Sequence, residues 1–386
     1  MQSATSTRGR RNARAAVAGL VVVATATIAT HAGATSDPPA SNPASSGLEI
    51  VWVEQGAGNP YWDAQHAAAE EAAHRLGFDF RVVSGELDPS VQASVVQQTV
   101  DQDPDAIMVN AIDPSAIAQA YEYAADHDVP IVNLYGLDDN ATASITFDEV
   151  HTGEMMGAHA LKLLEERYGE PSGQVAVLTG IQGQPASDLR AKGFTDFMAA
   201  HDIEVVDEQP TNWQADQASA TMENWLTRYP DLSMVYSLSD TLTVPAMNIA
   251  ERQDRLCRND TAPADLGDCV MFVSVDGIFL DEVVKGRMFA TAPYSPEWSG
   301  FKFAELANAV ASGGDYQPEN VINSMLVTPE NAECVLGMTT AMTDDLANFP
   351  FEGTLQEIAA DSYGCTVLDE PASSAPTASD AAATTA

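Results

Sequence analysis

The sequence has few basic residues relative to its acidic ones. Among 386 residues there are 17 Lys and Arg against 56 Asp and Glu, which gives a formal net charge of −39 at pH 7. Nucleic acids and anionic membranes attract proteins through basic surfaces, so this composition argues against both as partners. The acidic residues are spread along the chain rather than gathered in one block. This pattern indicates a solvated acidic surface, either as an adaptation to saline surroundings or as a simple aid to solubility.

Common catalytic motifs are also absent. The chain contains no Gly-x-Ser-x-Gly nucleophile turn and no His-Glu-x-x-His zinc helix. The glycines of Gly56-Ala57-Gly58 are not followed by the Gly-Lys-Ser/Thr of a phosphate-binding loop, so they indicate a turn. We therefore expect neither a catalytic site nor a cofactor or a metal ion, and we predict that the chain is not an enzyme.

Cysteine is scarce, and its spacing is informative. The four cysteines form no Cys-x-x-Cys pair, which excludes zinc-ribbon and thioredoxin-like sites. An even number in an exported chain favours disulfides, and four cysteines allow three pairings. We predict pairing between sequence neighbours, Cys257 with Cys269 and Cys334 with Cys365, while free thiols or another pairing remain open.

The N-terminus has the pattern of an export signal. Four arginines between residues 8 and 14 precede an uncharged stretch from Ala15 to Thr30, and Ala32-Gly33-Ala34 fits a cleavage site. We predict a signal peptide over residues 1–34 and a periplasmic or extracellular location; a twin-arginine signal and a retained anchor are alternatives. Cleavage would remove four basic and no acidic residues, leaving 13 basic against 56 acidic and a net charge of −43.

The flanks of the mature chain have low-complexity composition. Residues 35–47 are rich in Pro and Ser, and residues 369–386 are rich in Ala, Ser and Thr. Such segments cannot bury a core, so we expect a tether before the folded part and a disordered tail after it.

Between these flanks, short apolar runs alternate with amphipathic helical segments. The helix predicted over Pro60–Leu76 has Asn59 as its cap, Pro at its first position and Gly77 at its end. Strict alternation predicts parallel sheets covered on both faces, here two doubly wound α/β lobes. The runs expected to form strands are 49–55, 79–85, 106–112, 130–136, 174–180, 204–210, 233–239 and 271–277.

Polar and aromatic residues follow several of these predicted strands. Asn59-Pro60-Tyr61-Trp62 comes after the first strand, Tyr135 ends the fourth, and Ser239-Asp240 and Asp276-Gly277 end the last two. Ligands of open parallel sheets bind beyond the carboxyl ends of the strands. These residues are therefore candidates for a polar, aromatic-lined binding cleft.

An ordered set of motifs covers roughly residues 48–332. It comprises Asn59-Pro60-Tyr61-Trp62, Ala106-Ile107-Met108-Val109 with Asp113, Val129-Pro130-Ile131, Arg190-Ala191-Lys192-Gly193-Phe194, Ser239-Asp240, Val275-Asp276-Gly277 and Val327-Thr328-Pro329-Glu330-Asn331. In its order and spacing, this set resembles the ribose-type periplasmic sugar-binding proteins of ABC transporters. The resemblance implies two lobes joined by three crossovers (a type I periplasmic binding protein fold). The first lobe would comprise 48–147 with about 295–323, and the second 148–294 with about 324–368.

The resemblance also implies a function and a set of site residues. The chain would capture a small sugar or polyol in the cleft and deliver it, as a monomer, to an ABC permease and its ATPase. A ligand-presenting sensor for a chemoreceptor or histidine kinase is an alternative. The implied ligand-binding residues are Asn59, Tyr61, Trp62, Tyr135, Arg190, Trp213, Ser239, Asp240, Asp276 and Tyr294.

The sequence departs from the family pattern at one site position. Tyr135-Gly136 stands where many relatives carry Asp-Arg, so a different ligand, larger or less hydroxylated than ribose, is one alternative. Asp240 has a second interpretation as the cap of a helix that starts near Leu242. We further expect that Arg190, Asp276 and Trp62 can be replaced without unfolding the protein, because a cleft residue supports the ligand rather than the core.

Overall fold

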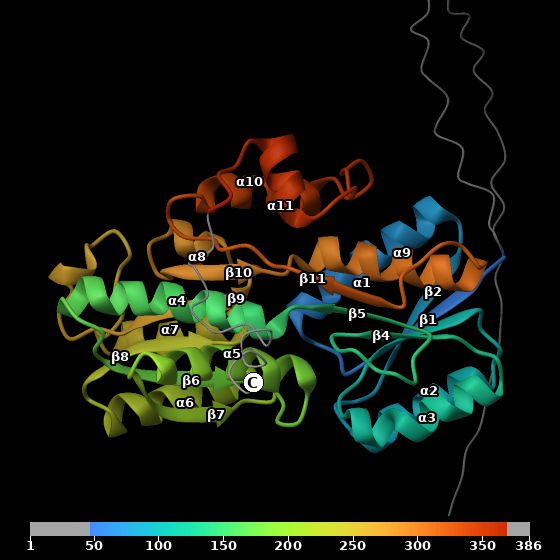
Figure 1. The fold of residues 1–386 in the computed structure, drawn as a ribbon, viewed down its shortest axis with the longest axis horizontal. Coiled ribbons are helices and arrows are strands. Elements are labelled where there is room, and N and C mark those ends of the chain that lie inside the picture. Colours follow the sequence, from blue (N-terminus) through green and yellow to red (C-terminus); the bar gives the residue numbers. More distant parts are fainter. Residues whose placement is uncertain (1–46, 369–386) are drawn as a thin grey trace, which may run out of the picture. The chain divides into compact units, whose positions relative to one another are not determined.

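The computed structural model describes residues 47–368, which form two separate β-sheets (Figure 1). The predicted signal peptide, most of the predicted tether and the predicted tail lie outside these residues. The first sheet has the strand order β11-β5-β4-β3-β1-β2, and every neighbouring pair in it is parallel. Its strands are β1 (Glu49–Glu54), β2 (Asp79–Ser84), β3 (Ala106–Asn110), β4 (Ile131–Leu134), β5 (Ala143–Phe147) and β11 (Glu319–Ile322).

The second sheet has the order β10-β9-β8-β6-β7, and its ladders are also parallel. Its strands are β6 (Gln174–Thr179), β7 (Glu204–Pro210), β8 (Leu232–Ser237), β9 (Met271–Asp276) and β10 (Ala290–Pro293). The predicted α/β class with two parallel sheets is thus confirmed. Eight of the strands were predicted from the sequence, and three short ones, β5, β10 and β11, were not.

Helices follow most strands, as the alternation predicted. They are α1 (Pro60–Leu76), α2 (Pro89–Val100), α3 (Pro114–Asp126), α4 (Glu149–Tyr168), α5 (Pro185–Ala200), α6 (Ala215–Arg228), α7 (Asp240–Arg252), α8 (Asp281–Val284), α9 (Pro296–Ser312), α10 (Ala332–Asp344) and α11 (Leu355–Glu357), with short 3₁₀ and π turns at Pro263–Asp265 and Ile358–Ser362. Helix α1 has the predicted limits. The Asn59 side chain accepts a hydrogen bond from the Tyr61 amide, and Gly77 ends the helix in a left-handed conformation.

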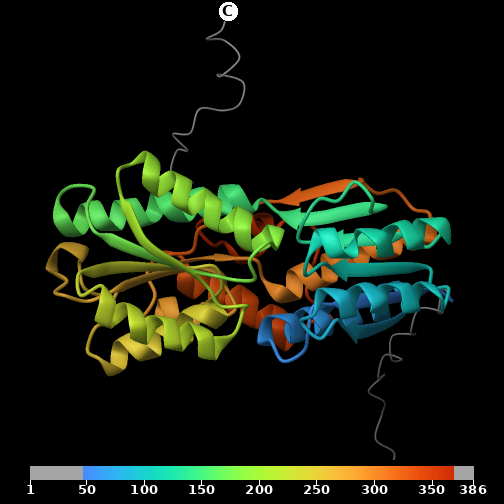
Figure 2. The same cartoon turned by 90° about the horizontal axis from the view of Figure 1, so that it is seen from below.

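Each sheet is covered on both faces. In β1, Ile50 and Trp52 pack on the side of α1, whereas Val53 belongs to the core beneath α2 and α3. This alternation follows from the two-residue period of a strand. Helices α1 and α9 pack together, as do α2 and α3, α4 and α5, and α6 and α7 (Figure 2). We call the first sheet with α1, α2, α3 and α9 the first lobe, and the second sheet with α4 to α8 the second lobe.

The chain passes between the lobes at three places. The first passage leads from β5 to α4, the second from β10 to α9, and the third from β11 to the segment in which Val327 bridges Thr291 of β10. The three passages lie next to one another. They therefore hold the carboxyl ends of the strands of both lobes at a common hinge.

Segments beyond the motif set pack on this frame. Helix α10 contacts both α8 and α9. In the loop that follows α10, Phe351 stacks on Phe301 of α9 with ring centroids 4.1 Å apart, and Trp298 donates from its indole Nε1 to the Gly353 carbonyl over 3.3 Å. The C-terminal segment therefore lies on elements of both lobes.

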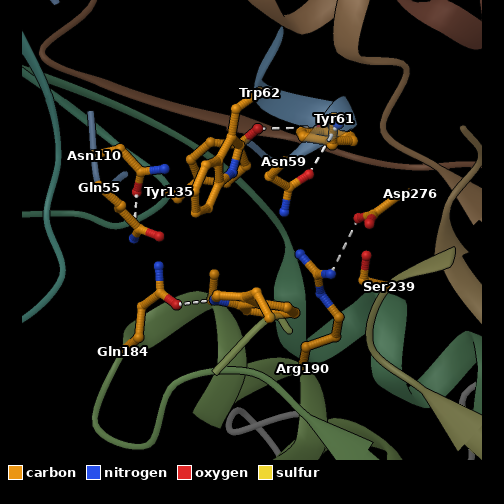
Figure 3. Close-up of a pocket in the computed structure, with 12 residues that line it drawn as sticks. Gln55, Asn59, Tyr61, Trp62, Asn110, Tyr135, Gln184, Arg190, Ser239 and Asp276 are labelled. Atoms are coloured by element: carbon orange, nitrogen blue, oxygen red, sulfur yellow. Dashed lines mark hydrogen bonds and ion pairs between the residues drawn. The ribbon is translucent and has the colours of Figure 1, made fainter. Parts of the chain in front are cut away.

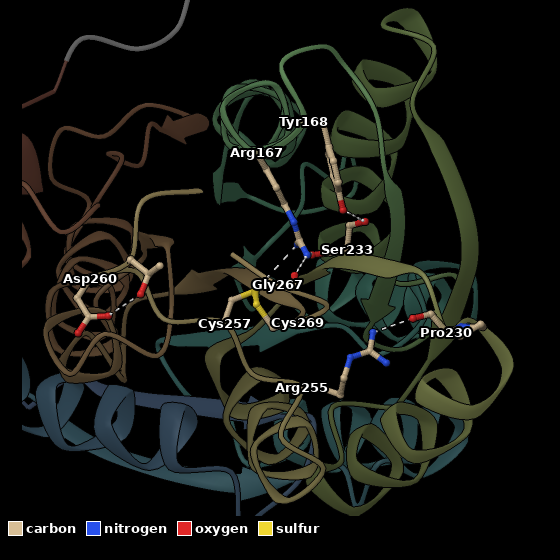
Figure 4. The surroundings of a disulfide bond; sticks show 10 residues. Arg167, Tyr168, Pro230, Ser233, Arg255, Cys257, Asp260, Gly267 and Cys269 are labelled. Atoms are coloured by element: carbon tan, nitrogen blue, oxygen red, sulfur yellow. Dashed lines mark hydrogen bonds between the residues drawn. A yellow bond between two sulfur atoms is a disulfide. The ribbon is translucent and has the colours of Figure 1, made fainter. Parts of the chain in front are cut away.

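Both predicted cysteine pairs are bonded in the structure. One disulfide joins Cys334 to Cys365, and the other joins Cys257 to Cys269 beside Arg167, whose guanidinium donates to the Gly267 carbonyl (Figure 4). The two bonds therefore close the polar insertion and the C-terminal extension. Within residues 47–368, none of the helices combines the length and the apolar character that a bilayer crossing requires.

Candidate ligand-binding site

A cavity lies where the carboxyl ends of strands from both sheets come together (Figure 3). The first lobe contributes residues that follow β1, β3 and β4, and the second lobe contributes residues that follow β6, β7, β8 and β9. The lining residues are Gln55, Asn59, Tyr61, Trp62, Asn110, Tyr135, Gln184, Ala186, Arg190, Trp213, Ser239 and Asp276. The position agrees with the general rule for open parallel sheets.

The start of α1 places three residues at the cavity. The Asn59 Oδ1 accepts the Tyr61 amide over 2.9 Å, so its capping role leaves the amide nitrogen of the side chain as the group free to donate to a ligand. Trp62 follows on the same turn and is only partly buried. The cap at Asn59 therefore fixes the positions of Asn59, Tyr61 and Trp62 at the cavity.

Gln55 and Asn110 form the polar end of the first-lobe wall. The Gln55 Nε2 donates to Asn110 Oδ1 over 3.1 Å and to the Ala111 carbonyl over 3.3 Å. The Gln55 Oε1, in contrast, is buried without a hydrogen-bond partner. A buried acceptor without a partner costs about 1–3 kcal/mol, so this oxygen favours a ligand that brings a donor such as a hydroxyl.

Two tyrosines join the floor of the cavity to the core. Gln65 of α1 donates to the Tyr135 hydroxyl over 2.5 Å, and Tyr135 donates to the Tyr61 hydroxyl over 3.1 Å. Burial raises the pKa of Tyr135, and the neighbouring Tyr61 hydroxyl partly opposes that rise. Both phenols therefore stay neutral, and their hydroxyl groups are already engaged with each other.

Arg190 of α5 is buried and almost fully paired. Its guanidinium grips Glu149 with two hydrogen bonds, Nε to Oε2 at 2.7 Å and Nη2 to Oε1 at 3.1 Å. The Nη1 donates to the Leu238 carbonyl and reaches Asp276 Oδ1 at 3.4 Å. Burial alone would lower the pKa of Arg190, but Glu149, Tyr294 and Asp276 together outweigh it and raise the pKa.

These contacts change the role expected for Arg190. Of the five N–H groups of a guanidinium, four are used within the protein, so at most one remains for a ligand. Glu149 begins α4 directly after the first passage between the lobes. Arg190 thus ties that passage to the strand ends of the second lobe, in addition to facing the cavity.

Tyr294 supports this pair from behind and does not line the cavity. Its hydroxyl donates to Glu149 Oε2 over 2.5 Å, its ring stacks on Phe147 at 3.7 Å, and the Arg190 guanidinium lies over the same ring at 4.5 Å. The ring is fully buried because the passages at Phe147 and Tyr294 run side by side. The structure therefore places Tyr294, expected from the sequence to contact a ligand, behind the cavity lining.

Asp240 also lies outside the lining. Its carboxylate accepts from the Phe279 amide over 3.0 Å and from the Thr291 hydroxyl over 3.1 Å, and thus fastens the loop after β9 to β10. The alternative interpretation of Asp240 as a helix cap is wrong. Helix α7 begins at Asp240 itself, and the cap is Ser239, whose hydroxyl accepts from the Thr241 amide.

Asp276 and Asp240 are buried acids with raised pKa values. Burial raises the pKa of Asp276 to about 7, with Arg190 acting in the opposite direction and Asp240 adding to the rise. Burial raises the pKa of Asp240 to about 6, although its hydrogen bonds oppose that rise. Asp276 can therefore accept from a hydroxyl in its charged form or donate to one in its neutral form near pH 7.

Trp213, the tryptophan that the second lobe contributes to the lining, packs against Gly180. Its indole Nε1 donates to Gln184 Oε1 over 2.7 Å. A Cβ at Gly180 would come within 2.0 Å of the Trp213 ring. Gly180 is therefore required for the position of Trp213, and Gln184 fixes the orientation of its ring.

Backbone strain gathers in the lining. Tyr135, Trp213 and Asp276 have φ values of 61°, 57° and 98°, in a region that side-chain-bearing residues rarely adopt. Such conformations cost of the order of 1–3 kcal/mol each and cluster at functional sites. The strain aims these three side chains at one cavity.

Eight of the ten predicted residues line the cavity, which leaves out Asp240 and Tyr294. Four further lining residues were not predicted from the sequence, namely Gln55, Asn110, Gln184 and Ala186. Gln55 is the last residue of the predicted strand 49–55 and Asn110 lies near the end of the predicted strand 106–112, so the same strand-end rule could have found them. No group of three or more His, Cys, Asp or Glu side chains in the described part of the chain is placed to hold a metal ion.

The fold and the cavity define a class of protein. Two parallel α/β lobes joined by three passages, with a polar and aromatic cavity at the hinge, describe a two-lobed solute-binding protein. The structure of an ABC transporter solute-binding protein from Bacillus halodurans C-125, with bound myo-inositol, is similar to this chain. The TM-score is 0.65 at 24% identity, over 75% of this chain and 97% of that chain.

Sequence comparison places the chain in a family. The model of the periplasmic binding protein domain matches residues 50–315, and the chain belongs to that family. It is 26% identical to the ribose import binding protein of Salmonella typhimurium, over 70% of this chain and 86% of that protein. It is 30% identical to the D-allose-binding periplasmic protein of Escherichia coli, over 51% of this chain and 61% of that protein. The chain is accordingly a binding protein and not an enzyme.

Proposed function

We propose that this protein captures a small sugar or polyol in the cavity between its lobes and delivers it to an ABC importer. The observation that carries the proposal is the composition of the cavity. Amide, carboxylate and guanidinium groups converge there with two tryptophans, and they come from strand ends of both lobes. The curated relatives support the proposal, since their names assign them ribose import and D-allose binding.

The chemistry of the lining suits hydroxylated ligands. The unpartnered Gln55 Oε1 and the Asp276 carboxyl can accept hydroxyl protons, and the Asn59 amide nitrogen can donate. The faces of Trp62 and Trp213 offer apolar surface for the C–H faces of a sugar ring. Because the two lobes hold different parts of this set, a ligand that touches both stabilises the closed arrangement over an open one.

The cellular setting follows from the same proposal. An exported protein loses its leader near Ala34, forms its disulfides in an oxidising compartment and meets a membrane permease with its ATPase. N-terminal sequencing of the exported protein and non-reducing peptide mapping test this part. A retained leader, or four free thiols, would contradict export by this route.

A thermal-shift screen tests the binding function. The purified mature chain is melted with D-ribose, D-allose, myo-inositol, other monosaccharides and glycerol, with amino acids as a non-sugar control panel. A ligand at a hundred times its Kd raises the unfolding free energy by about 2.7 kcal/mol, which a melting curve resolves. The proposal fails if no sugar or polyol raises Tm while an amino acid does, or if no compound in either panel does.

Variants then locate the binding. Trp62→Ala should weaken a ligand found in the screen by roughly tenfold to a hundredfold, through lost ring contact and buried area. Tyr168→Ala, which removes a half-exposed aromatic that does not line the cavity, is the control and should leave affinity unchanged. Equal affinities for the parent and both variants would move the site elsewhere.

A further inference from the structure

A second cavity adjoins the first. It has a volume of about 520 Å³, and it shares Asn59, Trp62 and Trp213 with the ligand cavity, so the two tryptophans stand at the boundary between them. We call this second cavity the outer chamber. Residues of both lobes line it, namely those around the start of α1 and the residue Leu87 on one side, and those around α6 and α7 on the other.

The ligand cavity, here called the inner cavity, and the outer chamber differ in the size of ligand that they can hold. The inner cavity measures about 50 Å³. One water needs roughly 10–15 Å³ by such a measure, so the inner cavity has room for only a few ligand atoms in this arrangement of the lobes. The outer chamber falls within the range of about 300–1,000 Å³ that is usual for ligand pockets. A ligand that enters the inner cavity can therefore extend mainly into the outer chamber.

The chemistry of the outer chamber differs from that of the inner cavity. Its walls consist mainly of apolar side chains, among them Leu87, Val244, Pro245 and Phe279. Its polar side chains are Asn59, Gln214, Asp216 and Thr241, and no guanidinium or ammonium group reaches it. A second sugar unit would need several hydrogen-bonding partners here, whereas an alkyl or aryl group needs none.

The backbone holds two of these apolar side chains in place. Leu87 and Trp213 both have a φ of 57°, which is unfavourable for residues with large side chains. The Leu87 amide donates to the Gln55 carbonyl over 2.7 Å, so its loop is fastened directly to the end of β1. The apolar wall is thus anchored to the same strand end that supplies Gln55 to the inner cavity.

We propose that the outer chamber binds an apolar substituent carried by the ligand, so that the preferred ligand is an alkyl or aryl glycoside rather than a free sugar. The proposal rests on the proposed function, because the sugar part must reach the polar groups of the inner cavity, which holds part of the sugar ring in this arrangement of the lobes. Trp62 and Trp213 contact both parts of such a ligand, at the glycosidic junction.

Paired glycosides test the proposal by calorimetry. D-ribose, D-allose, D-glucose and D-galactose are each offered as the free sugar, the methyl β-glycoside and the phenyl β-glycoside. For at least one sugar the phenyl glycoside should bind at least about tenfold more tightly than the methyl glycoside, since the ring buries apolar area that a methyl group does not. Phe279→Ala should abolish most of that advantage and leave the affinity for the methyl glycoside unchanged.

A matched pair of leucine variants provides the control. Leu87 is 38% exposed and lines the outer chamber, whereas Leu76 at the end of α1 is 37% exposed and does not. Leu87→Ala should reduce the phenyl advantage, and Leu76→Ala should not. Phenyl and methyl glycosides that bind equally, or an advantage that both Phe279→Ala and Leu87→Ala leave intact, would overturn the outer chamber alone. If no sugar binds in any form, the proposed function and this inference fail together.

Discussion

Replacing Arg190 tests whether this residue serves the ligand only, as the sequence suggested, or the fold as well. In the structure the buried guanidinium holds Glu149 with two hydrogen bonds and also contacts the Leu238 carbonyl and Asp276. In Arg190→Ala the Glu149 carboxylate stays buried, and the hydrogen bond that remains to it comes from the Tyr294 hydroxyl. Breaking a buried ion pair in this way costs about 3–5 kcal/mol.

That cost is large compared with the total stability of a protein domain, which is about 5–15 kcal/mol. At roughly 2–4 °C per kcal/mol, Arg190→Ala should lower Tm by about 6–20 °C in the absence of any ligand. The expectation that Arg190 can be replaced without harm to the fold is therefore revised. Urea unfolding followed by circular dichroism measures the change in free energy.

Two further variants make the test specific. Adding Glu149→Gln to Arg190→Ala removes the unpaired charge, so the double variant should recover part of the loss rather than sum the two single effects. Lys192→Ala on the same helix breaks an exposed pair with Asp196 and should change stability by less than about 1 kcal/mol. If Arg190→Ala melts with the parent and loses only ligand affinity, the structural role assigned to Arg190 is refuted.

Three other predictions concern titration, packing and salt. Because the pKa of Asp276 is raised to about 7 in the folded protein, the native state binds its proton more tightly than the unfolded chain, and the associated stability is present below about pH 4 and lost as pH rises through about 7. The unfolding free energy of Asp276→Asn minus that of the parent should therefore rise from pH 4 to pH 8, by an amount of the order of 4 kcal/mol. Urea unfolding at both pH values measures this difference, and the same difference at pH 4 and pH 8 would contradict the raised pKa. Gly180→Ala should displace the Trp213 ring and weaken a bound sugar at least about tenfold, measured by calorimetry, although no polar group is lost; unchanged affinity would mean that the ring makes no contact. Finally, a net charge of −39 should make Tm rise between low and molar NaCl, because salt at about 1 M reduces the range of charge repulsion to about 3 Å; a flat curve would leave solubility as the only effect of the acidic surface.

The sequence by itself determined the features that depend on local interactions. Asn59, Pro60 and Gly77 fixed the limits of α1, because capping and proline geometry act within a few residues. The alternation of strands and helices fixed the fold class, and the strand-end rule found most of the cavity lining. The short strands β5, β10 and β11 were not predicted, because their residues are smaller or more polar than those of the equally short β4 and form strands only through pairing with a neighbour.

Only the tertiary structure decided which polar residues face the cavity and which support it. Arg190 and Glu149 are 41 residues apart and meet because the first passage between the lobes lies against α5. The same passage stacks Phe147 on Tyr294 and so places Tyr294 behind the cavity lining as a buried support. Asp240, likewise, holds the Phe279 amide of the loop after β9 and the Thr291 hydroxyl of β10. Such contacts are long-range: no periodicity or spacing encodes them, because they form only when separate segments are packed together.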